Sequence, residues 1–165
     1  MTVENSNIPF ISEDRNILII GGTSGLGESI WKTLIKRQSS ENPSSGNINI
    51  FIVGRNVNKV NEINNYNNII KRSDVNIKCI SKDIAGGLNK DELIDNISKF
   101  ILDEAIIFFN KFNDKPIDML FLNAGVLILS PQGDMESKYR HYLWNTNFFA
   151  IRSLFLTAVD NKYLT

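Results

Sequence analysis

The sequence has few of the residues on which cross-links and metal centres depend. Its 165 residues include one cysteine and one histidine. The single cysteine, Cys79, excludes an internal disulfide framework and a cysteine-rich zinc site, and its apolar neighbours Ile77 and Ile80 predict a buried thiol in a strand. His141 has no acidic or nucleophilic neighbour at a suggestive spacing and is interpreted as structural. We therefore expect no metal site.

Neither sign of charge dominates, and long apolar runs are missing. The 18 basic and 18 acidic residues give a formal net charge of zero, so no basic field attracts nucleic acid and no polybasic stretch attracts an anionic membrane. No apolar run is long enough to cross a bilayer. Residues 1–10 have neither the basic start nor the apolar core of a secretory signal. We therefore expect a cytoplasmic protein, with neither nucleic acid nor a membrane as partner.

What the sequence does contain is a 42% hydrophobic content in a length close to that of one domain. Residues 1–15 are polar and aperiodic and are expected to form an arm, followed by a domain over residues 16–165. Short apolar runs, typical of buried strands, lie at 16–20, 48–53, 75–80 and 119–122. Helical patterns follow the first run up to residues 36–38 and recur at 57–70, 91–110 and 135–159. This alternation predicts an α/β fold with a doubly wound, Rossmann-like parallel sheet and helices on both faces.

A glycine-rich segment joins the first expected strand to the first expected helix. Such a turn needs a residue without Cβ at the turn, a second where the backbone approaches a pyrophosphate, and a third where helix meets strand. Gly21, Gly25 and Gly27 have this spacing, and the helix would direct its free N–H groups and positive dipole end at the phosphates. The segment predicts a dinucleotide site that includes Gly21, Thr23, Ser24, Gly25, Leu26 and Gly27.

Two competing nucleotide motifs fit less well. The phosphate loop of ATPases needs Gly-Lys followed by Ser or Thr, whereas Gly27 is followed by Glu28. A methyl-donor site would place an acidic residue at the end of the second strand, which ends in Gly54-Arg55.

These residues resemble the short-chain dehydrogenases/reductases. The glycines match the family's Gly-xxx-Gly-x-Gly pattern, although Ile20 stands where a Thr is frequent, and Gly54-Arg55 matches a common end of its cofactor strand. The resemblance implies that Asp83 contacts the adenine and that Asn123-Ala124-Gly125 borders the cofactor. It also implies that Asn147 belongs to the catalytic tetrad.

Arg55 indicates which dinucleotide is bound. An arginine at this strand end, in place of an acid, has the charge to pair a ribose 2′-phosphate. We therefore expect NADP as the cofactor, with NAD less favoured.

The family's chemistry needs residues that we do not find here. A Tyr donates a proton to the substrate carbonyl, a Lys in Tyr-xxx-Lys lowers the pKa of that phenol, and a Ser orients the substrate; in the family they lie at and beyond a fifth strand. Tyr163 has no following Lys and is interpreted as part of a frayed terminus. The expectation is a truncated chain with an incomplete sheet of about four strands, unable to catalyse alone.

The last expected helix is apolar nearly all round between Phe148 and Val159, more than a one-sided surface helix requires. Without a fifth strand, the apolar strand 119–122 would lie at a sheet edge, which favours association. We expect this helix to pair with a second copy or a full-length relative. Three hypotheses remain: a cofactor-binding part of an NADP-dependent oxidoreductase acting on carbonyl or hydroxyl groups, a non-enzymatic NADP-binding or dimerising module, and an incomplete gene model of an active reductase.

Overall fold

The sheet has four strands, and every neighbouring pair is parallel. The computed structural model describes residues 13–37, 46–70, 72–87, 93–129 and 135–165. The strand order is β3-β2-β1-β4. The strands are β1 (Arg15–Ile20), β2 (Ile48–Gly54), β3 (Val75–Ser81) and β4 (Met119–Leu122). Each predicted strand is present within one residue of its expected bounds. Residues 1–12 of the expected arm lie outside the described residues, and β1 takes up Arg15.

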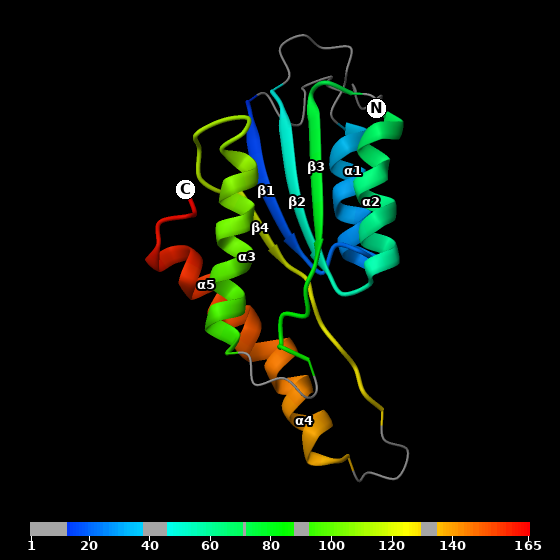
Figure 1. Cartoon of the computed structure of the whole chain (residues 1–165), viewed down its shortest axis with the longest axis vertical. Helices are drawn as coiled ribbons and strands as arrows, with labels where there is room; N and C mark the ends of the chain where they lie inside the picture. The colour runs from blue at the N-terminus through cyan, green and yellow to red at the C-terminus, as the bar shows by residue number, and fades with distance from the viewer. Residues whose placement is uncertain (1–12, 38–45, 71, 88–92, 130–134) are drawn as a thin grey trace, which may run out of the picture.

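Helices cover both faces of this sheet, as Figure 1 shows. One face carries α1 (Gly25–Arg37) and α2 (Val57–Ile70). The other carries α3 (Ile94–Phe109) and α5 (Ala150–Asp160), and α4 (Ser137–Trp144) extends below the sheet. This arrangement confirms the predicted α/β, doubly wound class. None of the helices in the described ranges is long and apolar enough to span a membrane.

Alternate side chains of β1 supply two separate cores. Ile17 and Ile19 belong to a cluster that includes Trp31 of α1, whereas Leu18 and Ile20 belong to a cluster with side chains of α3 and α5. A strand covered on both faces needs apolar residues at every position, because successive side chains point to opposite faces. This explains the continuous apolar runs in the sequence. Burial in the first of these clusters raises the pKa of the Cys79 thiol to about 12, and the predicted buried strand thiol is confirmed.

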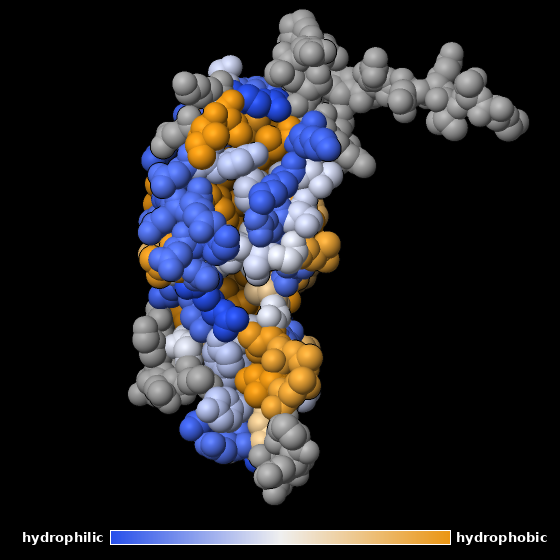
Figure 2. Space-filling model, turned by 90° about the vertical axis from the view of Figure 1, so that its right-hand side faces the viewer, coloured by the Kyte–Doolittle hydropathy of each residue, from blue (hydrophilic) through white to orange (hydrophobic). Residues whose placement is uncertain are grey.

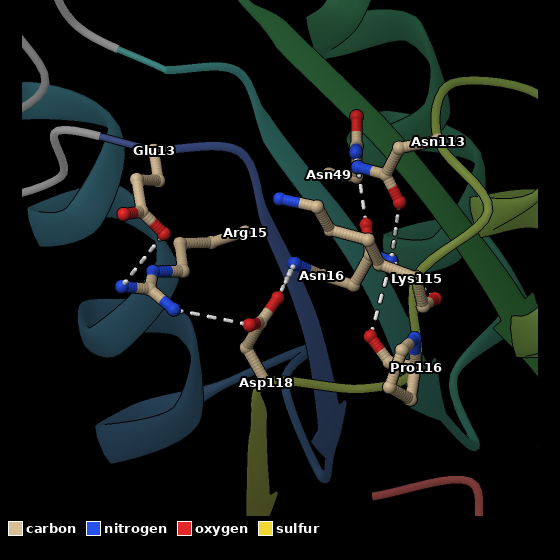
Figure 3. A network of polar contacts seen from close by, with 8 residues as sticks. All are labelled: Glu13, Arg15, Asn16, Asn49, Asn113, Lys115, Pro116 and Asp118. Carbon is tan, nitrogen blue, oxygen red and sulfur yellow. Dashed lines mark hydrogen bonds and ion pairs between the residues drawn. The ribbon is translucent and has the colours of Figure 1, made fainter. Parts of the chain in front are cut away.

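A row of asparagine side chains crosses the amino ends of the strands (Figure 3). The Asn16 amide donates to Asn113 Oδ1 at 2.7 Å, the Asn49 amide donates to Asn16 Oδ1 at 2.9 Å, and the Asn76 amide donates to Asn49 Oδ1 at 2.9 Å. Asn16 and Asn49 are fully buried. Buried amides need hydrogen-bond partners, and here the asparagine of each strand bonds the asparagine of the neighbouring strand. These bonds fix the strand register at the amino ends of the strands.

The last expected helix is a continuous run that contains a π-helical segment. Between α4 and α5, residues Asn145–Phe149 form η1, where the Ala150 N–H donates to the carbonyl of Asn145. Such segments occur frequently at functional sites. Asn147 lies within it, so the structure departs from a regular α-helix at a residue that the sequence had singled out.

The end of the chain is held in place, so the interpretation of Tyr163 as part of a frayed terminus is wrong. Its hydroxyl donates to Asp103 Oδ1 at 2.9 Å, and its carbonyl accepts from the Ile117 N–H at 2.7 Å. Leu164 forms a parallel bridge with Ile117. These partners lie on α3 and just before β4, so they are distant in sequence. Within the described residues β4 itself pairs only with β1 and is an edge strand, as expected.

Candidate functional site

A pocket lies at the carboxyl ends of the strands, where the segments following β1, β2, β3 and β4 meet. This edge, at the point where the strand order reverses between β1 and β4, is where open α/β sheets bind ligands. The lining residues come from all four segments and from η1. They are Gly21, Thr23, Ser24, Gly25, Leu26, Val53, Gly54, Arg55, Lys82, Ile84, Asn123, Ala124, Gly125 and Thr146.

Gly21 makes the turn out of β1. Its φ is +83°, a left-handed conformation that favours glycine, and a Cβ there would lie 2.7 Å from the Cα of Ala124. Its N–H donates to the carbonyl of Val53 at 2.8 Å. The glycine therefore allows the end of β1 to approach the segment after β4 closely.

Gly27 allows α1 to pack against the same turn. A Cβ at this position would lie 2.1 Å from the carbonyl oxygen of Gly21. The side-chain amide of Asn123 donates to that carbonyl at 3.1 Å, which ties the end of β4 to the end of β1. As a result the first turn of α1, with Gly25 and Leu26, borders the pocket. Amides of a first helical turn have no intrahelical acceptor and attract anions.

Gly54 gives Thr23 its place at the pocket. A Cβ on Gly54 would lie 2.4 Å from Thr23 Oγ1, so any larger residue would displace the buried threonine. The Gly-Arg pair at the end of β2 therefore has two functions: the glycine makes room for the loop, and Arg55 contributes a cation to the wall.

Three side chains from separate elements meet beside the pocket. Tyr142 of α4 donates its hydroxyl proton to Asp83 Oδ2 at 2.7 Å and accepts a hydrogen bond from Nη1 of Arg55. The other oxygen of Asp83 accepts from the Ala85 N–H at 3.0 Å. Burial raises the pKa of the Tyr142 phenol, the hydrogen bond to Asp83 raises it further, and Arg55 opposes both effects. Of this trio only Arg55 lines the pocket.

Asn147 lies next to the pocket rather than in its wall. Its amide accepts from the Val126 N–H at 2.7 Å and donates to the Val126 carbonyl at 2.8 Å. This pair of bonds anchors the segment that continues from Asn123-Ala124-Gly125. The described geometry therefore gives Asn147 a positional role for that segment.

Thr146, the neighbour of Asn147, is a site residue that the sequence reasoning missed. Its side chain is 2% exposed, it lines the pocket, and its Oγ1 has no hydrogen-bond partner among the described residues. A buried hydroxyl without a partner is costly, and a bound ligand in the pocket would supply one. No sequence signal marks this threonine, which stands between Asn145 and Asn147.

Most of the predicted cofactor residues come together in this pocket. Gly27, Asp83 and Asn147 support it from outside the wall. The wall also includes Lys82, which the sequence reasoning did not select; its ammonium lies 5.3 Å from the ring centroid of Phe100. Among the described residues, the lining includes two cations and a helix N-terminus but no carboxylate, which favours an anionic ligand. No group of His, Cys, Asp and Glu in the described ranges could hold a metal ion.

Comparisons by sequence give no match. No protein-family model matches the chain, and no curated protein matches it.

Comparison with solved structures does give matches, and they share the fold. A short-chain dehydrogenase/reductase from Saccharomyces cerevisiae is 24% identical, with a TM-score of 0.63 over 88% of this chain and 48% of that one. L-sorbose reductase from Gluconobacter frateurii, solved with NADPH and L-sorbose, is 17% identical, with a TM-score of 0.66 over 93% and 49%. A blue fluorescent protein from a metagenomic library, in complex with NADPH, is 16% identical, with a TM-score of 0.67 over 92% and 52%.

The fold is therefore that of the short-chain dehydrogenases/reductases, and the resemblance predicted from the motifs is confirmed at this level. The chain spans about half the length of the solved structures that it matches.

Proposed function

We propose that the pocket binds NADP and that the chain is the cofactor-binding part of an oxidoreductase of the short-chain type, acting on a carbonyl or hydroxyl substrate. The observation that carries this proposal is the composition of the pocket wall. It combines a helix N-terminus with the cationic side chains of Arg55 and Lys82, and the described residues that line it include no carboxylate. Two structures with this fold were solved with NADPH bound, which supports a nicotinamide dinucleotide as the ligand.

Each part of the dinucleotide has residues of matching chemistry. The pyrophosphate is proposed to bind at the first turn of α1, where amides and the helix dipole favour negative charge. Arg55 is proposed to pair with the 2′-phosphate, because a guanidinium can donate to two phosphate oxygens at once. Asp83 is proposed to contact the adenine from the edge of the wall, since a carboxylate bonded to Tyr142 and the Ala85 N–H keeps further lone pairs. Asn123-Ala124-Gly125 is proposed to border the ribose and nicotinamide side.

Hydride transfer is proposed to need more than these 165 residues. A bound nicotinamide supplies or accepts the hydride, but protonating the substrate oxygen requires a positioned acid. No tyrosine here begins a Tyr-xxx-Lys sequence. Asn147 is the proposed tetrad member, and its amide is engaged by Val126. We propose that the chain binds cofactor but does not reduce carbonyl compounds by itself.

Fluorescence titration with NADPH tests this function. We expect saturable binding of NADPH. Arg55→Ala should weaken NADPH binding by about tenfold or more, because a charged hydrogen bond is lost. The affinity for NADH should change by about twofold at most. Arg152→Ala is the matched control, since Arg152 is exposed on α5. A folded chain with no saturable NADPH signal would contradict the proposal, and equal losses for both cofactors would contradict the role of Arg55.

We further propose that a second copy of the chain covers the outer surface of α4–α5, here defined as Trp144, Phe148, Phe149, Phe155 and Val159. These side chains are each about half exposed, and Phe148 packs edge-on against Trp144 and Phe149. Leu127 and Leu129, which follow the Val126 that Asn147 anchors, are exposed as well. Figure 2 shows a hydrophobic patch low on the side of the molecule away from α5. Exposed apolar areas of this kind mark interaction sites.

Sedimentation measurements test this association. The proposal predicts a concentration-dependent dimer that Phe148→Asp converts to monomer, because the charge would be buried in the interface. Ile69→Asp is the matched control, since Ile69 is equally apolar and exposed on α2. A monomer at all concentrations would refute the proposal.

A further inference from the structure

The hydroxyl of Tyr142 joins two residues that follow neighbouring strands. Arg55 comes directly after β2 and Asp83 follows β3, and the two strands are paired. Arg55 donates through Nη1 to the Tyr142 oxygen, and the Tyr142 proton is donated to Asp83 Oδ2 at 2.7 Å. The guanidinium carbon lies 6.0 Å from the centroid of the Tyr142 ring.

The direction of these bonds follows from the donors and acceptors available. A guanidinium only donates and an ionised carboxylate only accepts, so a neutral phenol between them must donate to Asp83 and accept from Arg55. Each bond polarises the next and strengthens it. Asp83 is itself held by the Ala85 N–H at 3.0 Å. The row of bonds therefore ends on the Ala85 backbone at one side and on the Arg55 guanidinium at the other.

Tyr142 lies behind the pocket wall. Tyr142 is 8% exposed and does not line the pocket, whereas Arg55 does. Only one nitrogen of the guanidinium is used by Tyr142, and the described residues supply no other side-chain partner for it. The remaining N–H donors of Arg55 are left for a ligand in the pocket.

We infer that Tyr142 is a positioning residue: it holds the Arg55 guanidinium at the pocket wall and thereby sets the preference for a dinucleotide with a 2′-phosphate over one with a free 2′-hydroxyl. The inference rests on the proposed function. An arginine side chain that no other residue holds loses rotamer freedom when it binds a phosphate, and this loss weakens binding. An arginine already held by a buried phenol loses less, and the gain applies only to ligands that use this arginine.

Binding constants for NADPH and NADH in four proteins test the inference: the wild-type chain, Tyr142→Phe, Arg55→Ala and the double variant. Tyr142→Phe keeps the ring and removes only the hydroxyl. It should weaken NADPH binding by about threefold to tenfold and leave the affinity for NADH within about twofold of the wild-type value. With Arg55→Ala already present, Tyr142→Phe should change NADPH binding no further. Tyr139→Phe on the same helix is the matched control and should leave both constants unchanged.

These measurements distinguish a failure of the positioning role of Tyr142 from a failure of the proposed function. If the folded wild-type chain binds neither cofactor, the proposed function fails and the inference fails with it. If NADPH binds but Tyr142→Phe weakens both cofactors equally, or weakens NADPH as much without Arg55 as with it, the function stands and the positioning role is refuted.

A measurement on the wild-type chain does not depend on the variants folding. Nitrogen-15 relaxation of the arginine Nε groups should give Arg55 a higher order parameter than the exposed Arg152. An Arg55 that is as mobile as Arg152 would contradict the inference.

Discussion

The side-chain amide of Asn147 and the backbone of Val126 form two hydrogen bonds, of 2.7 Å and 2.8 Å, so that a π-helical segment holds the strand-like stretch beyond β4. The amide accepts from the Val126 N–H and donates to its carbonyl, which a carboxylate of the same shape cannot do. The geometry of the pocket's Asn123-Ala124-Gly125 wall depends on this contact, because Val126 directly follows it.

Asn147→Asp should therefore lower the free energy of unfolding by about 1 to 2 kcal/mol, since one bond is lost and a carboxylate faces a carbonyl oxygen. Urea unfolding measures the change. Asn65→Asp in the middle of α2 is the control, because its side chain is exposed and lies away from the helix ends. An Asn147→Asp variant as stable as its control would show that the pair of bonds does not hold this segment.

Two glycines of the loop should lose different amounts of stability when replaced by alanine. At Gly27 a Cβ would lie 2.1 Å from the Gly21 carbonyl, whereas at Gly25 no atom lies within 4 Å. We expect Gly27→Ala to lower stability by about 3 kcal/mol or more, because α1 must shift. Gly25→Ala should cost only about 1 kcal/mol for its positive φ. Thermal or urea unfolding compares them, and equal losses would contradict the close approach at Gly27.

The asparagine row should be intolerant of a gap in its middle. Asn49 is fully buried and bonds both to Asn16 and to Asn76. Asn49→Ala leaves an amide oxygen and an amide N–H without partners and should lower stability by about 2 to 4 kcal/mol. Asn76→Ala, at the partly exposed end of the row, should cost clearly less. Urea unfolding of the two variants tests the order, and the reverse order would contradict the network.

The phenol of Tyr142 should titrate above the ordinary range for tyrosine. Burial and the bond to Asp83 raise its pKa in the native state, so the folded chain holds this proton more tightly than the unfolded chain. The stabilisation is fully present below the unfolded pKa of about 10 and is lost as the pH rises through the native pKa. Tyr142→Phe should therefore flatten the alkaline loss of stability.

Tyr139→Phe is the comparison for that titration. It lies on the same helix, and its hydroxyl bonds neither Asp83 nor Arg55. Equal flattening by both variants would remove the special role assigned to Tyr142.

The sequence predicted the sheet because its signals are local. The run at residues 48–53 is buried at every position and is apolar except for Asn49, so its pattern is typical of a strand covered on both faces. The glycine loop was equally predictable, since turn, close approach and helix packing all act within seven residues, and Gly21 and Gly27 meet each other directly.

The rest of the site depends on contacts between distant positions. Tyr142 meets Arg55 and Asp83 only because the helix after β4 returns beneath the sheet, and no spacing in the sequence records that path. The π-helical segment, Asn-Thr-Asn-Phe-Phe, has no residue pattern that distinguishes it from an ordinary helix, so neither η1 nor the inward placement of Thr146 was predictable. Tyr163 had no local partner to indicate order; its partners lie on α3 and before β4.

The central claim is that the pocket at the carboxyl ends of the strands binds NADP. An amide NMR titration of nitrogen-15-labelled chain with NADPH tests it most directly. We expect saturable shifts centred on Gly21, Gly25, Leu26 and Gly125, together with a shift of the Arg55 side chain that NADH does not produce. Shifts confined to other surfaces, or none at all in a folded sample, would contradict it.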